Sequence, residues 1–382
     1  MVGLMGQTRS DVTQLFDRAG RVHPWDALAW RGDDGSPLNF HDLAIPTGEM
    51  RVHDGSIWVW RSWFPVDVGA PVTLGEGGTP LVAAPWLGDD VWLKLDYLNP
   101  TGSFKDRGTA LVVSALRNAG ATRLLEDSSG NGGSSLAGYA AAAELSARVL
   151  VPEGTSSAKI AATRAYGAQI VTVPGSRDAT SAEALRQVTS TDWTYASHAW
   201  HPLFPVGVAT QALEIWAQLD GRAPDTVVMV AGGGSMVLGH DLAWRALLAA
   251  NLIDAVPRLV MVQPAACAPL VQAWQTGADR VTNIDADTTL AEGTAIAHPV
   301  RDREVLAALR RLNGVAVATS EASIIDATRQ FAAHGHYVEP TAANALAGWR
   351  QVQPAGQTVI VLSGSGHKAS DAMRAVFSQP NP

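Results

Sequence analysis

The sequence predicts an α/β protein built on doubly wound parallel sheets. From about residue 109 onward, strand-like apolar runs alternate with helix-like segments, a pattern typical of parallel strands joined by helices. The chain has 382 residues, more than one hydrophobic core usually holds, so we expect two domains. Hydrophobic residues make up 47% of the chain and charged residues 17%, the balance of an ordinary globular protein.

The expected strands and helices are apolar segments bounded by glycine, proline or polar turns. Strands are expected at residues 123–126, 148–151, 169–173, 225–231, 258–263 and 357–362. Helices are expected at residues 108–120, 134–146, 158–166, 208–219, 236–248 and 369–377. Residues 1–70 contain five tryptophans without clear periodicity, and we interpret them as an N-terminal arm packed on the main body.

Charge and cysteine content narrow the classes of partner. The chain has 28 lysines and arginines against 36 aspartates and glutamates, so its formal net charge is −8. No basic run or basic-aromatic stripe favours nucleic acid or an anionic membrane, and no stretch reaches the roughly 18 apolar residues of a membrane span. The single cysteine, Cys267, excludes an internal disulfide and a cysteine-based zinc cluster, and no dedicated metal site is visible. We therefore expect a cytoplasmic protein that acts on small molecules.

The segment NPTGSFKDRG, residues 99–108, places Lys105 in a polar turn ahead of an apolar helix. Proline and glycine favour the turn, and Thr101 and Ser103 are candidate caps for the helix. A buried lysine amine has a lowered pKa and can attack a carbonyl to form a Schiff base. The competing interpretation is a solvated lysine in a charged Lys-Asp-Arg turn, which is the more common case for such a cluster taken alone.

The segment SSGN, residues 128–131, lies between a predicted strand and a predicted helix. This geometry points backbone N–H groups outward, where the helix N-terminus favours an anion. Taken alone, the string is more often a plain capped turn.

A second strand-to-helix connection contains Gly232, Gly233, Gly234 and Ser235. Glycines let the main chain approach a phosphate closely, and successive N–H groups form an anion nest. The string lacks the Gly-Lys-Ser/Thr of a nucleotide-binding P-loop and the full spacing of a dinucleotide fingerprint. A simple glycine turn is the alternative.

Polar residues elsewhere are weaker candidates. Ser363 follows an apolar strand, where its hydroxyl either caps the next helix or faces a ligand. His198 and His201 lie in a plausible cleft segment, but core and surface histidines outnumber catalytic ones, so neither is included in the predicted site.

Five segments resemble, in the same order, the pyridoxal phosphate (PLP) enzymes of the tryptophan synthase β or fold-type II superfamily. They are LGEGGTPL at 74–81, NPTGSFKDRG at 99–108, EDSSGNGGSSLAGYAA at 126–141, VAGGGSMVLG at 230–239 and VLSGSGHK at 361–368. They are most similar to the corresponding segments of threonine synthases. One glycine-rich match arises easily by chance, whereas five in order identify the chain as a member of this superfamily, with PLP as its cofactor.

The resemblance implies two doubly wound parallel-sheet domains with the cofactor in the cleft between them. Residues 71–109 and 206–382 would form the large PLP-binding domain, with the arm of residues 1–70 packed on it. Residues 110–205 would form a small mobile domain that closes over the cofactor. The resemblance also implies a homodimer.

The resemblance further implies a role for each candidate site residue. Lys105 would attach to PLP and act as the catalytic base, Phe104 would pack near the ring, and Ser363 would hydrogen-bond the pyridine nitrogen. The PLP phosphate would be held by Gly232, Gly233, Gly234 and Ser235. The substrate would be bound by Ser128, Ser129, Asn131 and Gly132, with Asn131 also contacting PLP. Many relatives carry threonine where this chain has Gly132, so one hydrogen-bonding hydroxyl is missing here.

The implied activity is PLP-dependent β- or γ-elimination or replacement on an amino acid, with a phosphorylated hydroxy amino acid as one candidate substrate. Positive charge for such a substrate is available from Arg107, Lys159, Arg164 and Arg177. Residues 201–215 are apolar where relatives commonly carry Glu, Gln or Lys, which leaves the phosphorylated substrate open. The alternatives are a serine or threonine dehydratase that deaminates its substrate and a PLP-binding protein without turnover. The presence of Lys105, Asn131 and Ser363 argues against the latter.

Overall fold

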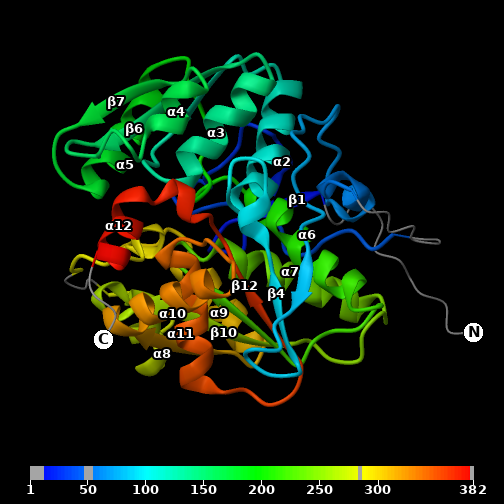
Figure 1. Cartoon of the computed structure of the whole chain (residues 1–382). Coiled ribbons are helices and arrows are strands. Elements are labelled where there is room, and N and C mark those ends of the chain that lie inside the picture. The colour runs from blue at the N-terminus through cyan, green and yellow to red at the C-terminus, as the bar shows by residue number, and fades with distance from the viewer. Residues whose placement is uncertain (1–12, 47–54, 283–285, 379–382) are drawn as a thin grey trace, which may run out of the picture.

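Two parallel sheets in two lobes organise the structure. The computed structural model describes residues 13–46, 55–282 and 286–378. In Figure 1 the upper lobe, mostly green, carries a four-stranded sheet, and the lower lobe carries a six-stranded sheet. Every strand pair in these two sheets is parallel except that of β3 with β4. The α/β class with doubly wound parallel sheets, predicted from the sequence, is therefore confirmed.

The six-stranded sheet has the order β11-β10-β9-β12-β4-β3. Its strands are β3 (Leu81–Ala83), β4 (Val91–Lys94), β9 (Thr226–Val230), β10 (Arg258–Pro264), β11 (Val315–Thr319) and β12 (Thr358–Val361). The central strands β9 and β12 are buried at every position, which explains why their sequences are continuous apolar runs instead of alternating patterns. Helices α7 (Ser235–Ala249) and α11 (Pro340–Val352) both pack against β9.

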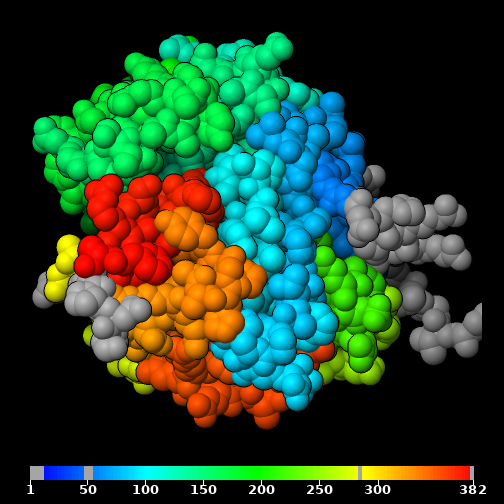
Figure 2. Space-filling view, in the orientation of Figure 1, coloured from blue at the N-terminus to red at the C-terminus, as the bar shows by residue number. Residues whose placement is uncertain are grey.

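The four-stranded sheet has the order β7-β6-β5-β8. Its strands are β5 (Arg123–Glu126), β6 (Ser146–Pro152), β7 (Gln169–Val173) and β8 (Thr194–Tyr195). They are connected by helices α3 (Asn131–Ala142), α4 (Ala161–Ala165) and α5 (Arg177–Ser190). Figure 2 shows this lobe lying against the red C-terminal segment, where the Ser156 hydroxyl donates to Asp371 at 2.9 Å.

The remaining helices surround the larger sheet. They are α2 (Lys105–Asn118), α6 (Leu203–Gln218), α8 (Pro269–Gln275), α9 (Asp302–Arg311), α10 (Glu321–Ala333) and α12 (Ser370–Ser378). Short 3-10 helices are η1 (Ile57–Trp63), η2 (Asp96–Leu98), η3 (Ala265–Cys267), η4 (Glu292–Thr294) and η5 (Gly366–Lys368). Within the described ranges, no helix is long and apolar enough to cross a membrane.

Helix boundaries are where the sequence prediction is least accurate. α2 begins at Lys105, three residues before the predicted start, and α3 begins at Asn131 instead of residue 134. In α2 the expected cap is reversed, because the Asp106 carboxylate accepts from the backbone N–H and the hydroxyl of Thr101 at 2.6 and 2.5 Å. The acidic side chain inside the helix therefore satisfies the turn, and Lys105 becomes a helical residue.

The described part of the N-terminal arm contacts both lobes. Its hairpin consists of β1 (Gln14–Phe16) and β2 (Val22–Pro24), and Arg18 next to it pairs with Glu304 of α9 at 2.8 Å. Trp60 and Trp63 are buried in the main core, and Trp30 packs edge-on against Tyr195 of the smaller sheet. Residues 1–12 and 47–54 of the predicted arm lie outside the described residues. The predicted domain boundaries and the mobility of residues 110–205 stay predictions.

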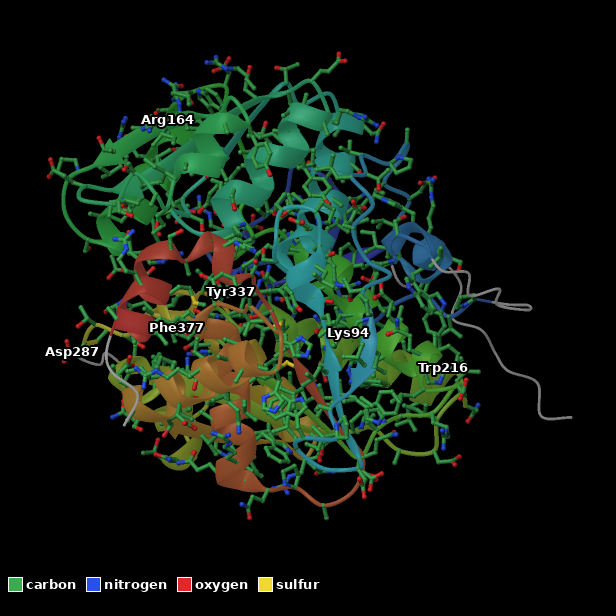
Figure 3. The ribbon with its side chains drawn as sticks, in the orientation of Figure 1. Lys94, Arg164, Trp216, Asp287, Tyr337 and Phe377 are labelled. Carbon is green, nitrogen blue, oxygen red and sulfur yellow. The ribbon has the colours of Figure 1, made fainter. Side chains whose placement is uncertain are left out.

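A buried ion cluster joins β4, η2, α2 and α6 beneath the larger sheet. The Arg107 guanidinium, fully buried, donates to both oxygens of Asp96 at 2.8 Å and to both oxygens of Glu214 at 2.6 and 2.7 Å. Lys94, labelled near the centre of Figure 3, donates to Glu214 at 2.7 Å, to the Thr79 carbonyl at 2.7 Å and to Gln218 at 2.9 Å. Two cations thus balance two carboxylates, and the pKa values of Asp96 and Glu214 are both lowered because their neighbouring cations outweigh the effect of burial.

Substitution of Arg107 by methionine tests this cluster. We expect the free energy of unfolding to fall by about 3–5 kcal/mol, because two carboxylates would remain buried with one cation between them. Urea denaturation of the two proteins measures the difference. Arg186→Met is the matched control, because it removes a surface arginine–carboxylate pair with Glu183 and should leave the unfolding midpoint nearly unchanged. Equal effects of the two substitutions would contradict a special contribution of the buried cluster.

Candidate functional site

One cavity of about 720 Å³ opens where the carboxyl ends of both sheets meet. This volume lies within the range of small-molecule sites, and the carboxyl edge of a parallel sheet is where such sites form. Every residue of the predicted site lines this cavity: Phe104, Lys105, Ser128, Ser129, Asn131, Gly132, Gly232, Gly233, Gly234, Ser235 and Ser363. The structure thus brings together residues from four separate sequence segments, while their individual roles stay predictions.

Lys105 is the first residue of α2, and its amine faces the cavity between two aromatic rings. Nζ lies 4.7 Å from the Phe104 ring centroid and 5.5 Å from that of Phe204. In the described part of the chain, no carboxylate forms an ion pair with it. Burial lowers the pKa of Lys105 to about 8, with Arg177 adding to the shift and Glu126 opposing it. A substantial neutral fraction of the amine is therefore available near physiological pH.

The segment from Ser128 to Asn131 leads from β5 into α3. No side chain caps α3, so its first backbone N–H groups face the cavity wall without that competition. The Asn131 amide donates to the Glu339 carboxyl group at 3.0 Å. A β-carbon placed on Gly132 would lie 2.9 Å from both His198 Nδ1 and Ser128 Oγ, so glycine at this position leaves room for the imidazole.

The glycine string leads from β9 into α7. Gly234 has a left-handed φ of +81°, and a β-carbon there would lie 2.2 Å from Val305, so both backbone strain and sterics require glycine. A β-carbon on Gly233, by contrast, would meet nothing within 4 Å. The 15-residue helix α7 has no side-chain cap, and open space at Gly233 therefore adjoins its uncapped N-terminus. Such a place suits a phosphate group.

Ser363 lies just after β12 and connects two walls of the cavity. Its carbonyl accepts the Phe104 N–H at 2.9 Å, which fixes the residue before Lys105. Among the described residues, none hydrogen-bonds the Ser363 hydroxyl, although the side chain is almost wholly buried. A ligand atom that can share a hydrogen bond would satisfy this hydroxyl.

These three features fit PLP. The unpaired Lys105 amine matches the aldehyde, the open glycine turn before α7 matches the phosphate, and the unbonded Ser363 hydroxyl matches the pyridine nitrogen. Within the described ranges, no group of three or more His, Cys, Asp or Glu side chains could hold a metal ion.

The sequence prediction missed three ionisable residues of the site. Glu339 and His198 line the cavity, and Glu126 lies behind His198. Burial raises the pKa of Glu339 to about 7. The motif VEPTAANALAG at residues 338–348 could have signalled Glu339, since proline at the next position starts α11 and places the carboxyl group at a helix entrance. His201, the other histidine considered, instead bonds the Ala27 carbonyl at 3.0 Å.

The four candidate cations separate into two pairs. Arg107 belongs to the buried ion cluster and is therefore unavailable to a substrate, which corrects the expectation drawn from the sequence. Arg164 is exposed on the upper lobe and does not line the cavity (Figure 3). Arg177 and Lys159 do line it, and Lys159 pairs with Glu292 at 2.8 Å. Residues 75–79, expected at the cleft rim, instead pack near Glu214, which accepts the Gly78 N–H at 2.9 Å.

Comparisons with known proteins agree with this geometry. The family model described as "Pyridoxal-phosphate dependent enzyme" matches residues 72–364. A threonine synthase of Synechocystis sp. is 33% identical over 330 residues, which cover 83% of this chain and 84% of that protein. A threonine synthase of Methanosarcina acetivorans is 29% identical over 350 residues, which cover 88% of this chain and 86% of that protein.

Solved structures give the same fold. A threonine deaminase of the organism abbreviated T.th. matches with a TM-score of 0.66 and 28% identity, over 75% of this chain and 92% of that one. A maize serine racemase matches with a TM-score of 0.67 and 19% identity, over 78% and 92% of the two chains, and supports the fold alone. The family match spans more than half of the chain, and it includes the lysine, glycine and serine residues that meet in the cavity. The chain therefore belongs to the pyridoxal-phosphate dependent enzymes of fold-type II, as a threonine-synthase-like PLP-dependent lyase.

Proposed function

We propose that this enzyme converts phosphohomoserine to threonine, with release of phosphate and addition of water. The observation that carries this proposal is Arg177, a guanidinium that lines the same cavity as Lys105. No described residue pairs with it or hydrogen-bonds it. An arginine without a protein partner suits the phosphate of a substrate, because its planar fork can bind two oxygens at once. The threonine synthase relatives support the same reaction.

The residues of the cavity divide the work as follows. PLP, when bound, supplies an electron sink for the pair left on the substrate's α-carbon. Lys105 Nζ removes the α-proton and later returns a proton, for which a pKa of about 8 is well matched. The uncapped start of α3, with Ser128, Ser129 and Gly132, binds the substrate carboxylate. The turn before α7 binds the cofactor phosphate, and the Ser363 hydroxyl bonds the pyridine nitrogen.

A serine or threonine dehydratase is the second candidate. The structural match to a threonine deaminase at 28% identity favours it, as does the apolar character of α6, where Val206, Val208 and Ala209 are buried away from the cavity. A dehydratase needs no cation for a distal phosphate, so the unpaired Arg177 favours the phosphorylated substrate. A PLP-binding protein without turnover is disfavoured by the presence of Lys105, Asn131 and Ser363 around one cavity.

The homodimer, the cytoplasmic location and closure of residues 110–205 over the cofactor remain parts of this proposal. They rest on the resemblance to fold-type II enzymes and on the net charge of −8 without any basic surface run. Light scattering of the purified protein tests the dimer.

Lys105→Ala tests the cofactor assignment. The wild-type protein with PLP is expected to show a visible absorbance band, and the variant is expected to lose it because no amine remains to attach the cofactor. Lys159→Ala is the matched control, since it removes another lysine of the same cavity and should keep the band. A wild-type protein without any band would overturn the assignment of PLP.

The pH dependence of PLP capture tests the state of the amine. Only a neutral amine attacks, so capture by cofactor-free enzyme is expected to accelerate as pH rises through the Lys105 pKa of about 8. The rate should increase about tenfold between pH 7 and pH 9 and then level off, because the neutral fraction rises from about a tenth to about nine tenths. Stopped-flow absorbance measures it. A rate that still rises steeply above pH 10 would indicate an ordinary, solvated lysine.

Arg177→Gln tests the distal phosphate. We expect KM for phosphohomoserine to rise about tenfold or more, because a charge-assisted contact is lost, and the PLP band to persist. Phosphate release measures the effect, and Arg164→Gln is the control, since that residue lies outside the cavity. Faster keto acid formation from serine or threonine than phosphate release from phosphohomoserine would favour the dehydratase.

A further inference from the structure

His198 and Glu126 form a buried pair at the carboxyl ends of adjacent strands. Glu126 is the last residue of β5, and His198 follows the parallel neighbour β8, so the sheet itself brings them together. The Glu126 carboxylate accepts the His198 backbone N–H at 3.0 Å, and His198 Nδ1 lies 3.2 Å from both carboxylate oxygens. The imidazole ring packs edge-on against Phe204, which also faces Lys105 Nζ.

This pairing determines which ring nitrogen is basic. A carboxylate offers no proton, so Nδ1 must carry the hydrogen that it shares with Glu126. The lone pair of a neutral imidazole then lies on Nε2. No described residue hydrogen-bonds Nε2, the atom is not sealed from solvent, and His198 lines the cavity. The pair therefore presents a proton acceptor to the space that Lys105 also faces.

The charges around His198 keep it neutral. Burial lowers its pKa, and the positive charges of Lys105 and Arg177 lower it further, against the opposing effect of Glu126. At neutral pH the ring is accordingly a base and not an acid. Glycine at position 132 permits this arrangement, since a β-carbon there would lie 2.9 Å from Nδ1.

We propose that His198, oriented by Glu126, is the base that activates the water added to the substrate, an inference that rests on the proposed function. As the water oxygen bonds to the substrate's β-carbon, its proton passes to Nε2. The electron pair of the opened carbon–carbon double bond ends on the α-carbon, which takes a proton from the Lys105 ammonium group. The imidazolium, stabilised by Glu126, then loses its extra proton to solvent. His198 is thus a catalytic residue, and Glu126 is a positioning residue.

The basic state of the pair also distinguishes replacement from simple elimination. Loss of a hydroxide leaving group from serine or threonine calls for an acid beside the β-oxygen, and a neutral Nδ1–H tautomer has no proton on the nitrogen that faces the cavity. Loss of phosphate needs no such acid, because phosphate leaves readily as an anion. A base near the β-carbon is useful once the leaving group has gone, when water must be deprotonated.

The products formed from phosphohomoserine by the PLP-loaded enzyme test this inference. Without water activation, the unsaturated amino acid would leave the site and hydrolyse to 2-oxobutyrate and ammonia, while phosphate release continued. His198→Asn keeps an amide near the Nδ1 position for Glu126 but removes the base at Nε2. We expect its ratio of threonine to 2-oxobutyrate to fall at least about tenfold, with the PLP band unchanged. Glu126→Gln should lower the ratio less.

His201→Asn is the matched control, since His201 is a buried histidine on the same segment that does not line the cavity. Its product ratio should equal that of the wild type. An independent readout is imidazole ¹⁵N NMR of the wild-type holoenzyme, which should show His198 protonated at Nδ1 and bare at Nε2 near pH 7.5. An unchanged ratio in His198→Asn, or an imidazole protonated at Nε2, would overturn the inference. Absence of phosphate release by the wild type would overturn the proposed function and this inference with it.

Discussion

The structure depends most on the buried guanidinium of Arg107, which is held between two carboxylates. Asp96 follows β4 and Glu214 lies in α6, so this one side chain connects the larger sheet, the start of α2 and a second helix. Lys105 lies two residues earlier on the same helix, about 200° away around its axis. When one face of the first turn is fixed in the ion cluster, the other face must point into the cavity. The position of the reactive amine thus follows from ion pairs that take no part in the chemistry.

Parallel strand order supplies the rest of the site. β5, β8, β9 and β12 all end toward the cavity, and each is followed by a residue or turn that lines it: the loop at Ser128, His198, the glycine string and Ser363. Because the turns after β5 and β9 open helices without side-chain caps, two sets of backbone N–H groups converge on one space. A cofactor phosphate and a substrate carboxylate can then be bound without any lysine at either place.

Sequence patterns predicted the features that are encoded locally. A glycine required by a positive φ, a turn before a helix and a serine after an apolar strand are visible in a few consecutive letters, and the predicted site residues all line one cavity. The missed features depend on partners far along the chain: Asn131 bonds Glu339, which is 208 residues away, and His198 is fixed by Glu126, 72 residues away. Arg107 was misassigned for the same reason, since its partner Glu214 is 107 residues distant. Helix starts were misplaced where a side chain such as Asp106 reaches backward to the turn.

Burial moves the ionisable groups of the cavity toward their neutral forms. It raises the pKa of Glu339 to about 7 and lowers that of Lys105 to about 8, and it also lowers the pKa of His198. Acids and bases therefore stand close to the point where each can exchange a proton at little cost. Arg177 resists this trend because a guanidinium keeps its charge at any physiological pH. A cavity whose acid–base groups are nearly neutral, with one persistent cation, favours an anionic substrate while keeping proton transfer among its own side chains easy.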